Sequence, residues 1–256
     1  IPVVAALADR LDTLFSFFSI GEAPTGSRDP FALRRAALGI IALSAPYRLD
    51  IHQAFTAWLD EEPTQRLEIT PGELASRRVE DQVLEFLVGR LEVQQREAGI
   101  RHDRIRASTR WNDADDGRLD RIVARARSLH ALLDTDEGAN LLAGYRRAAN
   151  ILKIEEAKEG QPFYPYVQPE LLAEPAEIEL DHALDAAATV VSDAVAAEDF
   201  AAAMSALAAL RPAVDRFFDV VTVNADDQKL RANRLALLAK LRRTAQSVAD
   251  FALIEG

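Results

Sequence analysis

The C-terminal stretch from Arg211 to Phe251 constrains the fold most, because its apolar residues recur at helical spacing on both sides of a short polar break at residues 224–227. Proline suits the first turn of a helix, so we expect one helix to run from Pro212 to about Val223. Asp226 or Asp227 is the expected N-cap of a second helix that continues into the 240s. The pattern therefore predicts two consecutive helices joined by a short turn.

A helical wheel of the second helix places its apolar residues on one face: Leu230, Leu237, Leu238, Leu241, Ala245 and Val248. Lys240 and Arg243 fall on the opposite, polar side. Arg234 lies within the apolar stripe, and its burial would require a carboxylate partner. Asp215 or Asp219 of the preceding helix is the expected partner.

The composition extends this helical reading to the whole chain of 256 residues, which is long enough for one large or two modest domains. Hydrophobic residues make up 49% and charged residues 28%, with Ala, Leu, Arg and Glu prominent. We expect an all-α, multi-helix protein built mainly of antiparallel helical bundles.

Two further features bear on where such a chain works. No apolar run approaches the roughly 18 residues that span a bilayer, so no membrane association is expected. The chain has no cysteine, which excludes disulfides and thiol chemistry and, without a secretory signal, favours a cytoplasmic protein. It begins with Ile1 and Pro2 rather than with Met, which favours a piece of a longer protein.

The charge of the chain is unevenly distributed. The net charge of -11 argues against indiscriminate binding to polyanions. Residues 170–200 include nine acidic residues and no Lys or Arg, whereas residues 229–243 include six basic residues and no acidic ones. Any contact with nucleic acid must therefore be local.

The N-terminal part reads as successive helices. An amphipathic helix is expected over residues 3–18, and Asp29 with Pro30 is the expected N-cap and first turn of the next helix, which Pro46 should end. A longer helix is expected over residues 78–98.

The loop ahead of that second helix allows two interpretations. Backbone N–H groups of residues 25–28 could cradle a phosphate, but the loop lacks the pattern of a P-loop, so a capped turn is favoured. Arg28, Arg34 and Arg35 could bind RNA or a partner subunit, or be merely solvated.

Residues 101–127 contain eight arginines against five acidic residues, around a segment with Trp111. Arginine beside an aromatic residue could stack on RNA bases. The mixing of Asp and Arg at helical spacing more often marks an exposed, salt-bridged face, and we favour that interpretation. The four histidines are scattered without zinc-site spacing, so no metal site is predicted.

A helix capped by residues 135–137 carries a polar arc beside its apolar face. The arc consists of Arg146, Arg147, Asn150 and Lys153, which could hold phosphates and read base edges or could form a solvated helix face. The proline-rich loop that follows carries Tyr164 and Tyr166, which could stack on unpaired bases or pack down as a plug.

Several of these stretches resemble the C-terminal part of the bacterial glycyl-tRNA synthetase beta subunit. The resemblance rests on the segments IGEAPTGSRDPFALRRAALGI, YRRAANIL and FFDVVTVNADDQKLRANRLALLAKLR. It is weak over residues 101–139 and 160–196. It implies the end of an HD-like helical domain at residues 1–45, a helical connecting region at 46–138, and a DALR-type anticodon-binding domain at 139–256.

The resemblance also implies a function. The chain would be the part of a glycine–tRNA ligase that binds the anticodon and body of tRNA(Gly), in a heterotetramer of two alpha and two beta chains. The alpha subunit would hold the class II aminoacylation site with ATP and Mg, so this chain would need neither a cofactor nor a catalytic residue of its own. The candidate tRNA contacts are Arg146, Arg147, Asn150, Lys153, Lys240, Arg243, Tyr164 and Tyr166. Arg28, Arg34 and Arg35 are candidates for contact with the acceptor arm or the alpha subunit.

Two other functions compete with this one. The fragment ADRL resembles the last metal-binding aspartate of HD phosphohydrolases, which would be Asp9, but the other ligands of that site are absent before it. Composition alone supports a helical scaffold that binds only protein.

Overall fold

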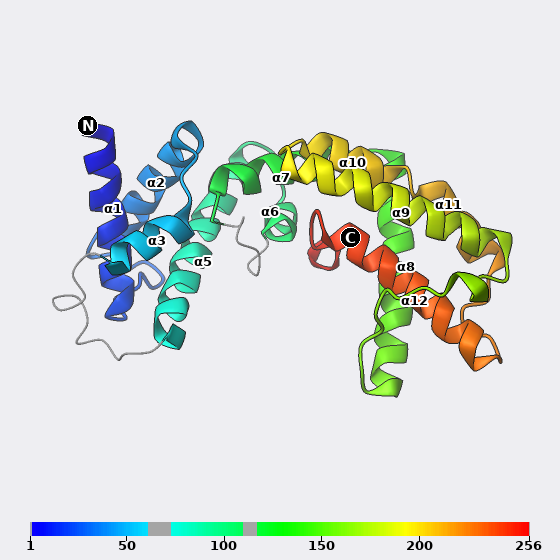
Figure 1. Ribbon diagram of the computed structural model, residues 1–256. Coiled ribbons are helices and arrows are strands. Elements are labelled where there is room, and N and C mark those ends of the chain that lie inside the picture. The colour runs from blue at the N-terminus through cyan, green and yellow to red at the C-terminus, as the bar shows by residue number, and fades with distance from the viewer. Residues whose placement is uncertain (1, 61–72, 110–116, 256) are drawn as a thin grey trace. The chain divides into compact units, whose positions relative to one another are not determined.

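The computed structural model describes residues 2–60, 73–109 and 117–255, in which helices are joined by turns and loops (Figure 1). They contain no β-strand, only two isolated bridges. The predicted all-α class is therefore confirmed. The chain folds into two compact units, Ile1–Val123 and Ala124–Gly256. No helix in the described ranges is long and apolar enough to cross a membrane.

The first unit is built around α1, α2 and α5, which all pack against one another. Its elements are α1 (Pro2–Ser19), α2 (Leu33–Tyr47), α3 (Ile51–Asp60), α5 (Glu73–Glu97) and α6 (His102–Ser108). Leu14, Phe15, Ile40 and Leu87 are fully buried between them. The ring of Phe15 meets that of Phe55 edge-on, with centroids 4.9 Å apart. Burial of aliphatic and aromatic side chains thus forms the core of this unit.

The bounds of α2 differ from the prediction at both ends. The helix begins at Leu33 rather than Pro30, and Asp29 caps it from four residues away by accepting the N–H groups of Leu33 at 2.8 Å and Arg34 at 3.0 Å. Pro46 lies inside the last turn, because a proline so close to the end removes only a terminal hydrogen bond.

The second unit contains the C-terminal helices. Its elements are most of α7 (Leu119–Leu133), then α8 (Asp136–Glu159), η1 (Pro169–Leu171), α9 (Pro175–Ala196), α10 (Phe200–Ala208), α11 (Arg211–Val220), α12 (Gln228–Gln246) and η2 (Phe251–Leu253). In Figure 1, α9 runs alongside α10 and α11, and it also packs against α12. α8 packs against α11 and α12.

α12 is the central helix of this unit, because its middle is enclosed by other elements. Residues 233–239 are all buried, so the predicted division into one apolar and one polar face is wrong here. The predicted cap is confirmed: the Asp227 side chain accepts the N–H groups of Lys229 at 2.8 Å and Leu230 at 3.1 Å.

The predicted partner of Arg234 is also wrong. Arg234 is buried as expected, but its Nε donates to the carboxylate of Glu177 on α9, and its Nη1 donates to the carbonyl of Thr222 at 2.8 Å. Asp215 instead pairs with Arg211, at 3.4 Å. The carboxylate that satisfies Arg234 therefore comes from a helix 57 residues away rather than from the preceding one.

The arginine-rich segment is less exposed than predicted. Arg104, Arg121 and Arg125 are buried, and the guanidinium of Arg125 lies 5.0 Å from the ring centroid of Phe200. Trp111, which prompted the stacking interpretation, lies outside the described residues.

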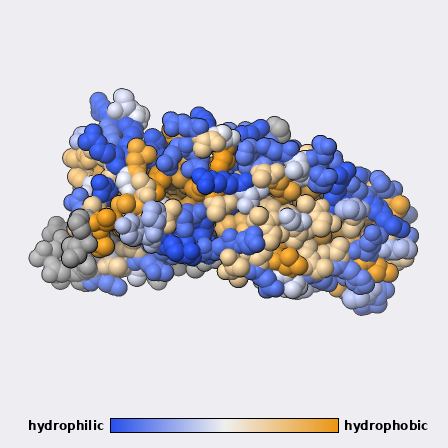
Figure 2. All heavy atoms as spheres, turned by 90° about the horizontal axis from the view of Figure 1, so that it is seen from above, coloured by the Kyte–Doolittle hydropathy of each residue, from blue (hydrophilic) through white to orange (hydrophobic). Residues whose placement is uncertain are grey.

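The surface over α9 and α10 is weakly hydrophobic and poor in cations. Figure 2 shows a pale field over these helices, and Ala186, Ala188 and Ala201 are among the exposed residues there. No residue of α10 is charged, and α9 has acidic residues but no Lys or Arg. Since phosphate binding requires cations, this surface is excluded as a nucleic-acid interface.

Candidate nucleic-acid interface

α8 presents the polar arc that the sequence predicts. Thr135 caps the helix by accepting the N–H of Gly138 at 3.0 Å, and Gly160, with φ 70°, ends it. Leu141, Tyr145, Ala148 and Leu152 are buried on one side. Asn150 and Lys153 are exposed on the other, one turn apart.

Two arginines of the arc have intramolecular contacts. Arg146 is half-buried and donates from Nη2 to the carbonyl of Ile254 at 2.8 Å. The guanidinium of Arg147 lies 4.4 Å from the ring centroid of Phe218 on α11. Of the four predicted residues, Asn150 and Lys153 are therefore the most available to a ligand.

The loop after α8 is attached to α8 and α12 at Phe163. The carboxylate of Glu156 accepts the Phe163 N–H at 3.0 Å. Arg242 donates to the same carboxylate at 2.8 and 3.2 Å, and to the Phe163 carbonyl at 3.3 Å. The hydrogen bond from Arg242 is the main reason that the pKa of Glu156 is lowered, which keeps this carboxylate charged.

Tyr164 and Tyr166 follow directly and point outward instead of forming a plug. The two residues are 61% and 77% exposed, and their ring centroids lie 6.2 Å apart. Lys153 precedes Glu156 by three positions, so the exposed end of the α8 arc borders the place where Arg242 holds this loop.

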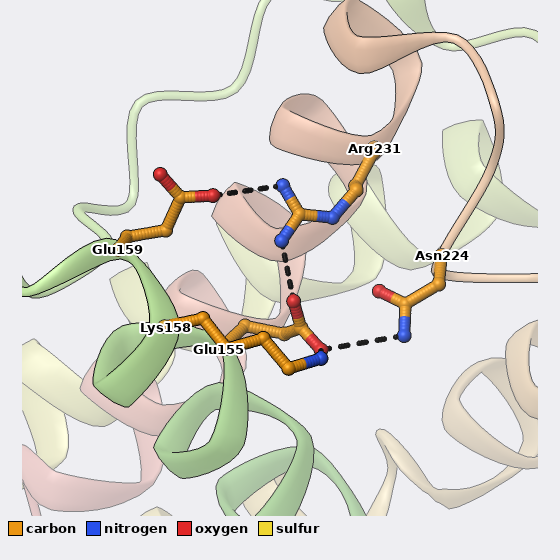
Figure 3. Close-up of polar contacts among 5 residues, drawn as sticks. All are labelled: Glu155, Lys158, Glu159, Asn224 and Arg231. Atoms are coloured by element: carbon orange, nitrogen blue, oxygen red, sulfur yellow. Dashed lines mark hydrogen bonds and ion pairs between the residues drawn. The ribbon is translucent and has the colours of Figure 1, made fainter.

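A second cluster of charges joins the end of α8 to the beginning of α12 (Figure 3). Glu155, whose side chain is only 4% exposed, accepts from Lys158 at 2.7 Å, from Asn224 at 3.4 Å and from Arg231. Arg231 also reaches Glu159 at 3.0 Å. Hydrogen bonds from Lys158 and Arg231 outweigh burial and lower the pKa of Glu155 to about 2. This cluster stabilises the packing of the end of α8 against the beginning of α12.

The two residues predicted on α12 are placed differently from the α8 arc. Lys240 has a side chain that is 17% exposed and lies between Asp181 at 2.6 Å and Asp185 at 2.7 Å, both on α9. Burial opposes its charge, but the hydrogen bonds to these two carboxylates raise the pKa of Lys240. Arg243 is exposed. Asn150, Lys153 and the two tyrosines are therefore exposed on α8 and the loop that follows it, whereas Lys240 faces α9.

Sequence reasoning missed Arg242 and Arg231. They are eleven positions apart, about three helical turns, so they share one face of α12. That face meets the acidic end of α8, at Glu155, Glu156 and Glu159. Both could have been found by pairing the basic residues of segment 229–243 with the three glutamates at the end of α8.

In the first unit, the loop at residues 25–28 is closed on itself. Thr25 and Arg28 exchange backbone hydrogen bonds of 3.2 and 2.8 Å, and Arg34 donates to the Gly26 carbonyl at 2.5 Å. These contacts agree with the favoured capped turn. Arg28 and Arg35 are exposed.

Asp9 is exposed on α1. Within the described part of the chain, no group of three or more His, Asp or Glu side chains could hold a metal ion.

The sequence of the second unit matches a known class of anticodon-binding domain. Residues 141–251 match the family of the DALR anticodon binding domain, and this range contains most of α8 and all of α12. Residues 1–110 match the family of the glycyl-tRNA synthetase beta subunit. The chain belongs to this beta-subunit family and carries the DALR domain at its C-terminal side.

Three curated relatives are similar over the whole chain. It is 45% identical over 260 residues to the glycine–tRNA ligase beta subunit of Cereibacter sphaeroides, 46% over 257 residues to that of Rhodospirillum centenum, and 46% over 260 residues to that of Phenylobacterium zucineum. Each match covers 100% of this chain and 36%, 35% and 34% of the respective relative. The chain thus spans about a third of the length of these relatives.

Proposed function

We propose that this chain is the tRNA-binding portion of the beta subunit of a glycine–tRNA ligase, in which the DALR domain binds the anticodon and body of tRNA(Gly). The observation that carries the proposal is the coincidence of the DALR match with the exposed arc of α8 and the adjacent tyrosines. That the tRNA is the one for glycine is inferred from the names of the similar proteins, which are glycine–tRNA ligase beta subunits.

The α8 arc has the groups that RNA binding requires. Lys153 offers positive charge to a phosphate, and such contacts set the register of the RNA. Asn150 can donate to and accept from a base edge. Because the whole chain has a net charge of -11, contact is confined to this locally cationic surface.

The role of the chain in the reaction is positioning. Aminoacylation takes place on an alpha subunit that holds glycine, ATP and Mg, in a cytoplasmic assembly of two alpha and two beta chains. By fixing the tRNA, the beta subunit raises the effective concentration of the acceptor end at that site. Arg28 and Arg35, exposed on the first unit, are suited to contact the acceptor arm or the alpha subunit.

A titration of the chain with tRNA(Gly) and with a non-cognate tRNA, at about 50 and about 200 mM salt, tests the proposal. Affinity that falls with salt and favours tRNA(Gly) is expected. Absence of binding at the lower salt concentration would contradict it and would favour the protein-binding scaffold.

A further inference from the structure

We propose that residues 163–168, here called the tyrosine loop, form a preorganised stacking site for an unpaired nucleobase, and that Arg242 and Asn233 set its shape without touching the RNA. This inference deepens the proposed function and rests on it. It assigns a ligand class to the tyrosines and a positioning role to two residues of α12.

The tyrosine loop is held at both ends by side chains of one helix. At its start, Arg242 donates to the Phe163 carbonyl at 3.3 Å while also holding Glu156, which accepts the Phe163 N–H. At its end, the side-chain oxygen of Asn233 accepts the Gln168 N–H at 2.7 Å, and its Nδ2 donates to the Gln168 carbonyl at 3.1 Å. The Asn233 side chain that makes this second attachment is buried.

The backbone between these attachments is also restricted. The Tyr166 N–H donates to the Tyr164 carbonyl at 2.9 Å, which closes a three-residue turn over Pro165. Proline fixes its own φ and narrows the conformations of the residue before it. Pro162 and Pro169 flank the loop on either side. The backbone positions from which the two rings project are therefore set by the folded chain.

The two rings are exposed although the backbone that carries them is held in place. Tyr164 is 61% and Tyr166 77% exposed, so each ring has surface that a planar group can cover. A base stacked on an aromatic side chain gains affinity whatever its identity, since every base has a π-face. Because the backbone of the loop is already held, little backbone conformational entropy is lost on binding, which favours such a site.

Charge distinguishes the stacking site from the phosphate-binding arc. The guanidinium of Arg242 is neutralised by Glu156, so it positions the loop instead of attracting RNA. Lys153, three positions before Glu156 on α8, is exposed and suited to the phosphate next to a stacked base. Exposed tyrosines also suit a protein interface, but the match to an anticodon-binding domain and the exposed Lys153 on the helix before the loop favour RNA.

Binding of a stem-loop RNA with the anticodon loop of tRNA(Gly) tests the role of the rings. Tyr164→Ala and Tyr166→Ala should each weaken binding about tenfold without changing its salt dependence, because no charge is removed. Tyr164→Phe and Tyr166→Phe keep the rings and should bind like the wild type. Unchanged affinity in the alanine variants would overturn the stacking site while leaving the proposed function intact, provided the wild type binds the stem-loop.

A double-mutant cycle tests the positioning role of Arg242. Arg242→Ala should weaken binding several-fold in the wild type but less than about twofold in the chain that lacks both tyrosine rings. Its salt dependence should stay that of the wild type. A salt slope lower by about one would instead mean that Arg242 contacts a phosphate directly, and additive losses would mean that it acts independently of the rings.

A second variant covers the case in which Arg242→Ala fails to fold. Glu156→Gln removes the charge that holds Arg242 while keeping the size of the side chain, and it should reproduce the ring-dependent loss. Wild-type affinity in a folded Glu156→Gln variant would overturn the positioning role. If the wild type itself bound no tRNA(Gly), the proposed function would fail first, and the two failures are thus distinguishable.

Discussion

Arg234 of α12 and Glu177 of α9 form a buried ion pair that also organises the start of α9. The carboxylate of Glu177 accepts the backbone N–H groups of Ala173 at 2.5 Å and Glu174 at 2.9 Å as well as the guanidinium. Glu177 is thus both part of the capping box of α9 and the counter-ion of Arg234. The central helix and the beginning of α9 are therefore stabilised together.

Replacing Arg234 with alanine is expected to lower the free energy of unfolding by about 3–5 kcal/mol, because it leaves a buried carboxylate without its cation. Urea denaturation measures the loss. Arg243→Ala, an exposed change on the same helix, is the matched control and should stay within about 0.5 kcal/mol. Equal stability of the two variants would contradict the role of the pair.

The Glu155 cluster is expected to make stability sensitive to acid. The pKa of Glu155 is lowered from 4.5 to about 2, so its stabilisation is fully present above pH 4.5 and is lost as the pH falls toward 2. Glu155→Gln should therefore be less stable than the wild type at neutral pH, and the difference should shrink through this range. Urea denaturation at several pH values checks this, and a difference independent of pH would refute it.

The double change Asn150→Ala with Lys153→Ala should weaken binding of tRNA(Gly) and reduce the salt slope by about one, since one phosphate contact is removed. The melting temperature should hardly move, because both side chains are exposed. Arg146 is left in place because it also holds Ile254. A titration at several salt concentrations measures the slope, and unchanged binding would remove these two residues from the interface.

Lys240→Ala is the contrasting variant on α12. Because the ammonium group of Lys240 forms ion pairs with Asp181 and Asp185, we expect this variant to have lower thermal stability and nearly unchanged affinity for tRNA. A loss of tRNA binding at unchanged stability would restore the assignment of Lys240 to the RNA contact that the sequence suggested.

Two glycines on helices should respond oppositely to alanine. A Cβ at Gly138 would lie 2.0 Å from the Leu132 carbonyl oxygen, so backbone must shift and stability should fall by about 2 kcal/mol. A Cβ at Gly89 on α5 meets nothing within 4 Å, and this change should stabilise by about 0.5–1 kcal/mol. Thermal unfolding of both variants measures the contrast, and a stable Gly138→Ala would refute the clash.

Features that depend on neighbouring residues could be predicted from the sequence. Thr135 and Asp227 cap the helices that follow them, because a short polar side chain bonds N–H groups only two or three positions away. The buried face of α8 followed from its 3.6-residue period for the same reason.

Features that depend on distant residues could not be predicted. A helical wheel of α12 predicts that Arg234 is buried, but it cannot identify its partner Glu177, which lies on another helix. The wheel likewise placed Arg146 and Lys240 on polar faces. In the structure, Arg146 donates to the carbonyl of Ile254, 108 residues away, and Lys240 pairs with aspartates of α9. The candidate site could therefore be located to α8 and its loop, but the choice among its cations needed the tertiary structure.

The enclosure of α12 limits how this part of the chain can change in length. Each residue of a helix advances the next by about 100°, so one residue inserted or deleted within residues 233–239 would rotate every later side chain out of its place. Arg242 would turn away from Glu156, and Lys240 away from Asp185. We therefore expect that insertions and deletions among natural variants avoid the middle of α12 and collect in the connections between helices.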